Sequence, residues 1–467
     1  HLLAKKLNQI RLNELNKLTI KESPIYKLSL LFEKAGYEFN VVGGTIRDLI
    51  LGVESDDYDI CTNAKPKEIL NIVKDVAQHL WRQGEVFGTI GLSFEDLKFE
   101  ITTYRKEIYG DDSRKPQVEF GDDLETDLSR RDFTINSMAF SLPDAKLIDP
   151  YSGLDDLLNQ RLRTPLEPSV SFSDDPLRMM RAARFIARFD LVPDIALLDA
   201  VDKYRSRMSI ISAERIRDEL CKLLIAQDPS KGLYFLSETK LSDEFFPEFN
   251  ILSIPQDPQN HHKDVLIHTI AVVANTRPEL RVRLAALFHD IAKPDTYDVG
   301  ENGVTFRFHE VLGAKMTRKR MRELAFSKEM IKEVSQLVFL HLRIHTYAMG
   351  WTDSAVRRYV RDAGELLADL NHLQRCDCTT KNPRKAKELS DRMDDLESRI
   401  LELSKKEELN KIRPHLDGAQ VMEHLKLKPS REVGTALDYL LEHRLENGPI
   451  PEQDAYKLLD SWAIENL

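Results

Sequence analysis

The spacing of the hydrophobic residues changes once along this chain, near residue 150. Before that point, short apolar runs such as VVGG and TIGLSFEDLKFEITTYR alternate with amphipathic segments such as TIRDLILG, as strands and helices do. Beyond it, nearly every apolar stretch has helical spacing, as in DDPLRMMRAARFIARF and VRLAALFHDIA. The sequence therefore predicts an α+β fold: a small α/β head with a mixed sheet, followed by an extended all-helical body.

Polar segments divide this predicted architecture further. At 467 residues the chain is too long for one hydrophobic core. We expect an N-terminal helix over 1–25, the head over 26–150, a helical neck over 151–254, a second helical domain over 255–400 and a helical tail over 401–467. Within the head, the segment KEIYGDDSRKPQVEFGDD is rich in Gly, Pro and Asp, and is predicted to be a mobile loop.

Composition narrows the class of protein. No apolar run approaches the roughly 20 residues that span a bilayer, and the first residues lack a signal-peptide core, so we expect a cytoplasmic protein without a membrane partner. Four cysteines make no disulfide scaffold, and no obligate protein partner is evident. The net charge of −10 leaves RNA binding open, because phosphate contacts need only a local basic surface such as KMTRKRMRE. For any single run of this kind, a solvated helix face is the commoner explanation.

Two carboxylates lie two residues apart in DDYDI, at Asp57 and Asp59. On a strand this spacing points both side chains to one face, where their oxygens suit hard divalent cations such as Mg²⁺. Glu100 in FEITTYR can supply a third carboxylate from a neighbouring strand. Such a group suits phosphoryl transfer, in which one metal activates the attacking hydroxyl and another stabilises the leaving pyrophosphate. Taken alone, acidic pairs at strand ends are more often surface decoration.

A glycine pair follows the first predicted strand. Gly43 and Gly44 lie between that strand and a helix, where exposed backbone N–H groups can hold a triphosphate. Arg47, on the same helix, is grouped with them as a nucleotide-binding candidate. A simple turn is the alternative explanation for the glycines.

The order of these segments carries more information than any one of them. VVGGTIRDLILG, DDYDI, FEITTYR and RRDFTINSMAF follow one another, and then SFSDDPLRMMRAARF and SAERIRDEL. Over about residues 38–220 this order resembles the family of class II tRNA nucleotidyltransferases (CCA-adding enzymes) and bacterial poly(A) polymerases. The resemblance implies that Asp57, Asp59 and Glu100 are the catalytic, metal-binding acids. It also implies that the incoming nucleotide's ribose and triphosphate are held by Arg131, Asp132 and Asn136.

In that family an E-D-x-x-R motif selects the base, and here it reads Asp174-Asp175-x-x-Arg178, with the first acid shortened. A carboxylate at 175 can accept from the exocyclic amine of C or A while Arg178 donates to the adjacent ring nitrogen; G and U reverse both groups and are rejected. A helix cap with a surface ion pair is the ordinary interpretation of the same residues. Arg181 and Arg184 are further candidates for binding the triphosphate or the RNA end.

The C-terminal half contains LFHDIAKP, with the adjacent pair His289 and Asp290. With HKDVLIHT, VTFRFHEVLGAKMTRKRM, LVFLHLR and RCDCTT, it resembles the HD-domain-containing bacterial tRNA nucleotidyltransferases, particularly the actinobacterial type. The resemblance implies an HD domain over 255–400. Its implied metal ligands are His268, His289, Asp290 and Asp377, with His309 and His341 for a second metal. Imidazoles with carboxylates suit a divalent transition metal that activates water for phosphate-ester hydrolysis. Three other histidines are expected to be bystanders: His261, His262 and His345.

The resemblance implies a Mg²⁺-dependent nucleotidyltransferase that adds CCA to the 3′ end of tRNA from CTP and ATP without a template. A poly(A) polymerase, or an enzyme adding only CC or only A, is the alternative within the class. An HD phosphohydrolase acting on RNA ends is the alternative from another class, ahead of a non-catalytic tRNA-binding protein. The tail over 401–467 is expected to contact the tRNA, which family members recognise by shape.

Overall fold

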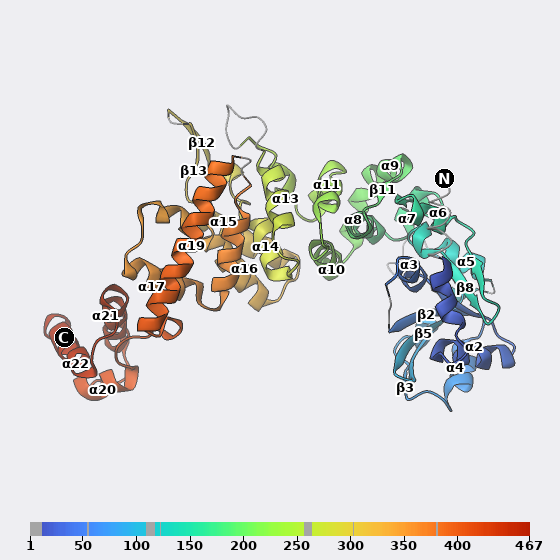
Figure 1. Cartoon of the computed structure of the whole chain (residues 1–467), viewed down its shortest axis with the longest axis horizontal. Coiled ribbons are helices and arrows are strands. Elements are labelled where there is room, and N and C mark those ends of the chain that lie inside the picture. Colours follow the sequence, from blue (N-terminus) through green and yellow to red (C-terminus); the bar gives the residue numbers. More distant parts are fainter. Residues whose placement is uncertain are drawn as a thin grey trace. The chain divides into compact units, whose positions relative to one another are not determined.

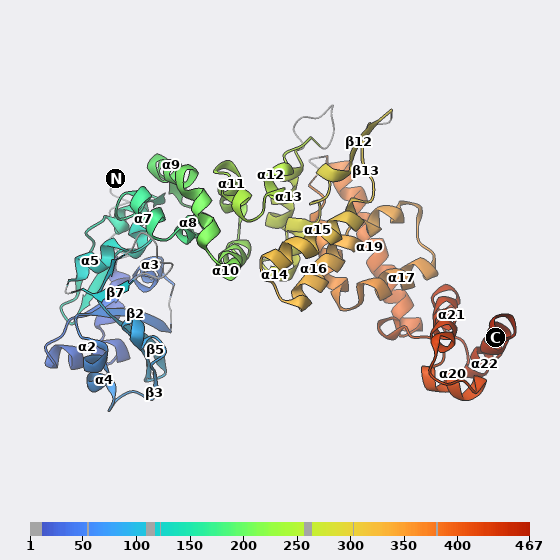
Figure 2. The ribbon, with the colours of Figure 1, turned by 180° about the vertical axis from the view of Figure 1, so that it is seen from behind.

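A computed structural model describes residues 12–53, 56–108, 117–121, 123–255, 264–301, 303–379 and 382–467. The chain folds into two compact units, His1–Pro247 and Glu248–Leu467 (Figures 1 and 2). The main sheet lies wholly in the first unit and the second is largely helical, so the α+β prediction is confirmed. Of the predicted N-terminal helix, residues 1–11 lie outside the described residues; the rest forms a short 3₁₀ helix, η1 (Glu14–Thr19), before α2 (Pro24–Lys34).

A seven-stranded mixed sheet forms the head. Its strands are β1 (Phe39–Val42), β2 (Asp57–Thr62), β3 (His79–Trp81), β4 (Thr89–Phe94), β5 (Leu97–Thr103), β8 (Ala139–Leu142) and β9 (Lys146–Ile148). They lie in the order β3-β4-β5-β2-β1-β8-β9. The β2–β5 pair is parallel, and the other neighbours are antiparallel.

Residues alternate between the two faces of this sheet. On one face Ile60, Leu92, Phe99 and Ile101 are buried, and α4 (Pro66–Val73) packs against β4 and β5. On the other face, the polar positions of β2 and β5 are exposed. This apolar-in, polar-out alternation leaves one face of the sheet free for chemistry.

Short elements surround the exposed face. They are α3 (Gly44–Ile50), η2 (Glu85–Phe87), β6 (Arg105–Ile108), β7 (Gln117–Phe120), α5 (Leu124–Ser129), η3 (Thr134–Asn136) and α6 (Gly153–Leu158). The polar segment predicted to be a mobile loop contains β6 and β7, which pair as an antiparallel hairpin. Residues 109–116 and 122 of that segment lie outside the described residues.

Helices complete the first unit. They are α7 (Pro168–Asp174), α8 (Leu177–Phe189), α9 (Ile195–Tyr204), η4 (Arg205–Ile210), α10 (Ala213–Leu224), α11 (Ser230–Glu238) and η5 (Leu241–Glu244). A two-stranded parallel pair, β10 (Arg161–Leu162) with β11 (Val192–Pro193), joins them. The central helix α8 packs against α10 and α11 through the buried side of its 3.6-residue repeat, and Phe185 makes an edge-to-face contact with Phe133.

The described part of the second unit is mainly helical and contains a hairpin that the sequence did not predict, β12 (Tyr297–Gly300) with β13 (Gly303–Phe306). Its first part contains α12 (Glu248–Ile251), α13 (Val265–Asn275), α14 (Leu280–Phe288), η6 (Pro294–Thr296), α15 (His309–Glu323), α16 (Lys328–Leu340) and η7 (Arg343–Met349). It continues with α17 (Asp353–Ala363), η8 (Gly364–Leu366), α18 (Leu367–Cys376), α19 (Pro383–Lys406) and η9 (Leu409–Lys411). None of the described helices is both long and apolar enough to cross a bilayer.

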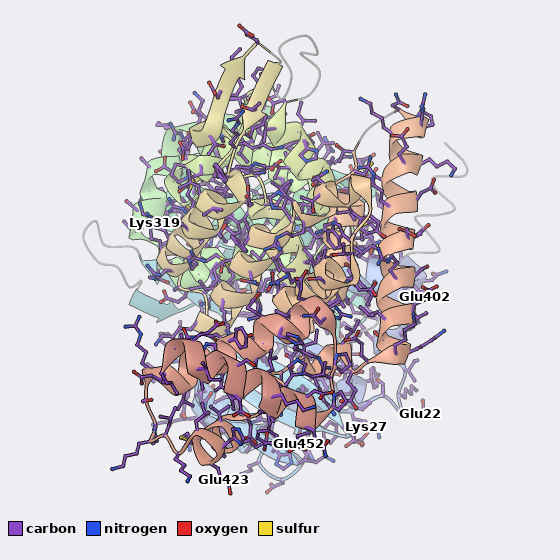
Figure 3. The ribbon with its side chains drawn as sticks, turned by 90° about the vertical axis from the view of Figure 1, so that its left-hand side faces the viewer. Glu22, Lys27, Lys319, Glu402, Glu423 and Glu452 are labelled. Atoms are coloured by element: carbon purple, nitrogen blue, oxygen red, sulfur yellow. The ribbon has the colours of Figure 1, made fainter. Side chains whose placement is uncertain are left out.

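Three helices at the C-terminus share a small core of their own. They are α20 (Gly418–Leu425), α21 (Arg431–Asn447) and α22 (Glu452–Asn466). The core contains Leu416, Val421, Val433, Ala436, Leu440, Ala455, Leu459 and Trp462. Charged side chains such as Glu423 and Glu452 lie on the outside of this group, as Glu402 does on α19 (Figure 3).

Candidate functional site

Strand pairing brings the three predicted carboxylates to the exposed face of the sheet. Asp59 on β2 is in register with Glu100 on the parallel neighbour β5, and Asp57 lies two residues earlier on the same face. All three side chains are exposed. Even so, desolvation by the surrounding protein raises the pKa of Asp59. The guanidinium of Arg131 lowers this pKa, and the carboxylates of Glu100 and Asp57 raise it further, so that it lies above its ordinary value. Carboxylates that disfavour each other's charge in this way fit a divalent cation.

Gly43 lies directly beside these acids. Its φ of +68° is in the left-handed region that favours glycine. A Cβ at this position would lie 3.0 Å from Nη1 of Arg131 and 3.9 Å from Oδ2 of Asp59. Arg131 is itself fixed by Asp127, to whose Oδ2 its Nη2 donates at 3.1 Å. The turn before α3 therefore favours glycine for two reasons: the positive φ would strain another residue, and a side chain would crowd Arg131. Without a side chain, the backbone of Gly43 lies close to Asp59.

Arg47, Asn136, Asp132 and Arg181 form a chain of hydrogen bonds that is buried from Arg47 to Asp132 and partly exposed at Arg181. Arg47 Nη1 donates to Asn136 Oδ1 at 2.5 Å, and Asn136 Nδ2 donates to Asp132 Oδ1 at 2.9 Å. Arg181 Nε then donates to Asp132 Oδ2 at 2.8 Å. Burial lowers the pKa of Arg47. It also opposes ionisation of Asp132, but Arg181, Asn136 and the backbone N–H of Phe133 together hold the pKa of Asp132 below its ordinary value. These four predicted nucleotide ligands bind one another and tie α3 and η3 to α8.

Arg184 also packs within the protein. Its Nε lies 3.2 Å from Oε2 of the buried Glu219, and its guanidinium lies over the ring of Phe185, 4.6 Å from the centroid. Desolvation lowers the pKa of Arg184 to about 10. Arg184 is one of four nucleotide-binding candidates on α8 and the turn before it, with Asp175, Arg178 and Arg181. Its guanidinium packs between Glu219 and Phe185.

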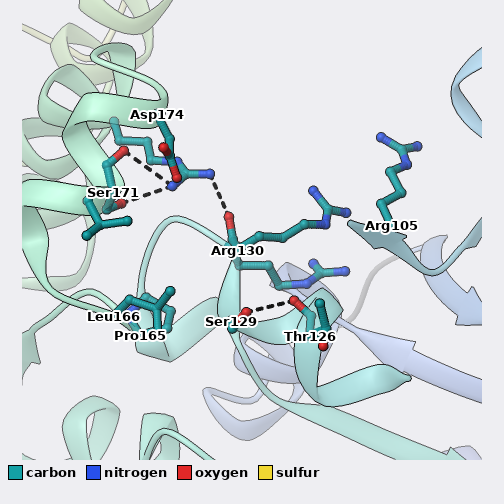
Figure 4. Close-up of a pocket in the computed structure, with 11 residues that line it drawn as sticks. Arg105, Thr126, Ser129, Arg130, Pro165, Leu166, Ser171 and Asp174 are labelled. Carbon is teal, nitrogen blue, oxygen red and sulfur yellow. Dashed lines mark hydrogen bonds between the residues drawn. The ribbon is translucent and has the colours of Figure 1, made fainter. Parts of the chain in front are cut away.

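Two cavities lead from the acids toward α8. One, of about 210 Å³, is lined by Asp59, Cys61 and Thr102 among others. The other, of about 160 Å³, is lined by Ser171, Asp174 and Arg178 among others (Figure 4). The residues that line both are Arg105, Arg130 and Arg131. Arg105 and Arg130 were missed from the sequence, although Arg105 lies two residues after the strand that carries Glu100 and Arg130 directly precedes Arg131.

The base-selection motif is divided between this cavity and a helix cap. Arg178 is fixed at the cavity wall, where Nη1 donates to Ser171 Oγ at 3.0 Å and Nη2 to the carbonyl of Arg130 at 2.6 Å (Figure 4). Asp174 also lines the cavity. Asp175 accepts from the backbone N–H of Leu177 at 3.1 Å and from Arg215 at 3.2 Å. Asp175 thus contacts the start of α8 and Arg215, while Asp174, the first acid of the motif, lines the cavity.

In the second unit, all six predicted HD ligands lie together. Among the described residues, two groups place three potential ligand atoms within 4.8 Å of one another: His268, His289 and Asp377; and Asp290, His309 and His341. Asp290 lies between the groups, with Oδ2 3.1 Å from His289 Nε2 and Oδ1 3.3 Å from His309 Nε2. Of the three predicted bystanders, His345 belongs to neither group, and His261 and His262 lie outside the described residues.

The donor set of this cluster fits metal ions. Nδ1 of His289, His309 and His341 each lies 2.6–2.8 Å from a backbone carbonyl. When Nδ1–H donates to that carbonyl, the Nε2 lone pair is left pointing into the cluster. Asp290 Oδ2 is buried and accepts no well-aligned hydrogen bond, although Lys293 Nζ lies 2.8 Å away. A buried carboxylate oxygen among imidazole lone pairs is a site that a cation can complete.

Known proteins match this chain in both units. Residues 39–163 match the family "Poly A polymerase head domain", 192–252 match "Probable RNA and SrmB- binding site of polymerase A", and 265–408 match "HD domain". The CCA-adding enzyme of Limosilactobacillus reuteri (strain DSM 20016) is 42% identical over 202 residues, which are 43% of this chain and 49% of that enzyme. The chain thus spans about half the length of the curated relatives it matches.

Solved structures with a similar fold cover nearly the whole chain. The CCA-adding enzyme of Bacillus stearothermophilus, in complex with CTP, has a TM-score of 0.69 at 22% identity, covering 95% of this chain and 97% of that one. The Thermotoga maritima CCA-adding enzyme, complexed with tRNA, has a TM-score of 0.59 at 18% identity, covering 97% and 98%. Head, RNA-binding and HD segments follow in one order over this fold. The chain therefore combines a poly(A) polymerase head domain, a segment like the RNA-binding site of polymerase A and an HD domain, and it is similar to CCA-adding enzymes.

Proposed function

We propose that this protein adds CCA to the 3′ end of tRNA from CTP and ATP, without a nucleic-acid template and with release of pyrophosphate. The observation that carries the proposal is the continuity of one surface. Asp57, Asp59 and Glu100 share the exposed sheet face, and cavities lined by arginines lead from Asp59 to Arg178. The names of the relatives, and the CTP and tRNA bound in similar folds, support the same activity.

Divalent cations, for which we propose Mg²⁺, would be held by Asp57, Asp59 and Glu100. When bound there, they would lower the pKa of the attacking hydroxyl and stabilise the leaving pyrophosphate. Arg105, Arg130 and Arg131 supply positive charge along the cavities, which suits a triphosphate. Gly43 leaves its backbone close to the same phosphates. The chain from Arg47 through Asn136 and Asp132 to Arg181 fixes the orientation of these side chains, which we propose hold the ribose and triphosphate of the nucleotide together with Arg131.

Base selection falls to the motif at the start of α8. Arg178 has two of its N–H groups occupied by Ser171 and by the Arg130 carbonyl, and the guanidinium has others to offer a base. Asp174 or Asp175 would accept from the exocyclic amine of C or A. Since G and U present a carbonyl at that place, the arrangement favours the two bases of CCA.

Removing charge from Asp59 tests the proposal most simply. Asp59→Asn keeps the shape of the side chain and is expected to reduce nucleotide addition to tRNA by about 10³-fold or more, because a metal ligand is lost. Asp75→Asn, an exposed aspartate in the loop after α4, is the matched control and should add nucleotides normally. Addition by Asp59→Asn at the wild-type rate would refute the assignment of the head.

The HD cluster favours a second activity, hydrolysis of phosphate esters at RNA ends by a divalent transition metal. Its two ligand groups, with the buried carboxylate of Asp290 lying between them, are the observations behind it. Asp290→Asn should abolish bound transition metal, measured by elemental analysis, together with phosphate release from RNA ends. Nucleotide addition by the same variant reports that the chain has folded. Wild-type protein that binds no such metal would contradict this second activity alone.

A further inference from the structure

The exposed face of the sheet extends past the carboxylates to the edge strand β3. Two rows of paired residues cross this face from β3 to β2. The first row consists of Trp81, Gly91, Glu100 and Asp59. The second row consists of His79, Ser93, Lys98 and Asp57. Because directly paired residues point to the same side of a sheet, Trp81 and His79 share the face of the catalytic acids.

Trp81 lies at this edge of the sheet with its ring partly exposed to solvent. Its side chain is 43% exposed. Its Cε3 atom lies 3.2 Å from the place where a Cβ on Gly91 would be, so the indole occupies space that the glycine leaves between the edge strand and Glu100. The His79 ring lies 6.5 Å from it, centroid to centroid, and Lys98 is exposed in the adjacent row. Trp81 lies two strands from Glu100 in the same row, with its ring open to solvent, so it can offer a binding surface on the face that carries the acids.

Seen from the carboxylates, the surface at Trp81 and the nucleotide cavities lie in different directions. Those cavities begin at Cys61, Thr102 and Arg105, at the carboxyl ends of β2 and β5. Trp81 lies sideways, three strand spacings or about 14 Å from β2. In an in-line displacement, the attacking hydroxyl and the leaving pyrophosphate are on opposite sides of the transferred phosphorus. The RNA therefore approaches the acids from a side that the triphosphate does not fill.

We propose that Trp81, with His79 and Lys98, is a stacking surface for the single-stranded 3′ end of the RNA being extended. The inference rests on the proposed nucleotidyltransferase function and names where its RNA substrate lies. Aromatic rings recognise unpaired bases by stacking, and an ammonium group such as that of Lys98 suits the connecting phosphates. Stacking accepts any base, which suits an end whose sequence changes with each addition. Trp81 acts on binding of the RNA and not on binding of CTP or ATP.

Three variants test the proposal in the full-length protein. Trp81→Ala removes the ring, Trp81→Phe keeps a smaller one, and Leu80→Ala alters an exposed neighbour that points to the opposite face of the same strand. Binding of a fluorescein-labelled tRNA transcript ending in CC, and of a short RNA with the same 3′ end, is measured by anisotropy without nucleotide. We expect Trp81→Ala to weaken the binding of both by about tenfold. Trp81→Phe should lose less, and Leu80→Ala should match the wild type.

Steady-state kinetics then locate the effect. Trp81→Ala should raise the KM for RNA while leaving the KM for ATP unchanged. Unchanged RNA binding by Trp81→Ala, an equal loss with Leu80→Ala, or a rise in the KM for ATP instead would overturn the inference. Because binding is measured without catalysis, the result is separate from the proposed function. If the wild type adds CCA and Trp81→Ala binds RNA normally, the stacking surface is refuted and the activity stands. If RNA binding depends on Trp81 but the wild type adds no nucleotide, the proposed activity is refuted and the stacking surface stands.

Discussion

We propose that single residues decide which base enters the cavity beside α8. Arg178 is held by Ser171 and by the carbonyl of Arg130, so its orientation is fixed before a nucleotide binds. Preorganised donors of this kind discriminate strongly, because the wrong base leaves them unpaired. The adjacent Asp174 and Asp175 differ in environment, since Asp175 is engaged by Arg215 and the helix terminus. We infer that the shortened first acid contributes to the cavity wall directly.

Replacing Arg178 should therefore change specificity more than rate. Arg178→Ala is expected to lower the preference for CTP over UTP by about tenfold or more, because the donor to the C ring nitrogen is lost. Single-nucleotide incorporation with CTP and with UTP measures the ratio of kcat/KM values. Arg188→Ala, an exposed arginine on the same helix, is the control and should keep the wild-type ratio. An unchanged ratio in Arg178→Ala would show that the base is read elsewhere.

Spacing alone predicted a common location only for residues that share one element, whereas a neighbouring strand supplied Glu100 and the family resemblance supplied the six HD ligands. The two-residue step from Asp57 to Asp59 predicts a common face, and strand pairing adds Glu100. The bonds from Arg47 through Asn136 to Asp132 join residues up to 89 positions apart, so no local pattern contains them. Arg105 and Arg130 were missed for the same reason, because a cavity wall is assembled by tertiary packing.

At the scale of elements, long helices were the easiest features to predict, because a 3.6-residue repeat extends over many positions. The hairpin β12–β13 and the pair β10–β11 have two to four residues per strand, too few for an alternation to be read. The segment over 106–123 has polar, Gly-rich and Pro-rich composition, yet its ends pair as β6 and β7. Pairing with a partner strand outweighed local composition there.

Two helical glycines make a matched test of packing between elements. In α11, a Cβ on Gly232 would lie 2.5 Å from the carbonyl oxygen of Ala183 on α8, so Gly232→Ala should lower the free energy of unfolding by about 1–3 kcal/mol. In α21, no atom lies within 4 Å of a Cβ on Gly434. Gly434→Ala should raise the free energy of unfolding by about 0.5–1 kcal/mol through helix propensity. Urea unfolding monitored by circular dichroism measures both, and equal effects would contradict this packing.

The C-terminal helices carry a pH-sensitive contact. Burial, with the nearby His443 and Arg444, lowers the pKa of His415 to about 4. An unfolded histidine titrates near 6.5, so between about pH 6.5 and 4 the unfolded state binds more protons. The free energy of unfolding of this region should thus fall as pH drops through that window. Amide hydrogen exchange in α20 and α21 is measured at pH 7 and pH 5 and corrected for intrinsic rates. The wild type should be less protected at pH 5 than at pH 7, and His415→Gln should not show this difference. Equal pH dependence in both proteins would refute the prediction.

For the whole molecule, the two candidate metal centres lie in different units of the chain. Hard oxygen ligands define the head, and imidazoles define the HD cluster, so different metals should serve them. Transition metal bound to the folded HD cluster should raise the thermal midpoint of the second unit, since binding stabilises the folded state. Scanning calorimetry with and without Mn²⁺ measures this, and His289→Ala, which removes a ligand, should lose the shift. A shift retained in His289→Ala would place the metal elsewhere.

The nucleotides that the protein adds to tRNA test the proposed activity most directly. Purified protein with Mg²⁺ is incubated with tRNA transcripts ending before CCA, after C and after CC, with CTP, ATP or both, and the products are resolved to a single nucleotide. We expect CC from CTP, one A from ATP, and no further growth. A long run of A would identify a poly(A) polymerase, and CC alone or A alone a partial enzyme. Phosphate release from RNA ends without any addition would contradict the central claim and assign the activity to the HD domain.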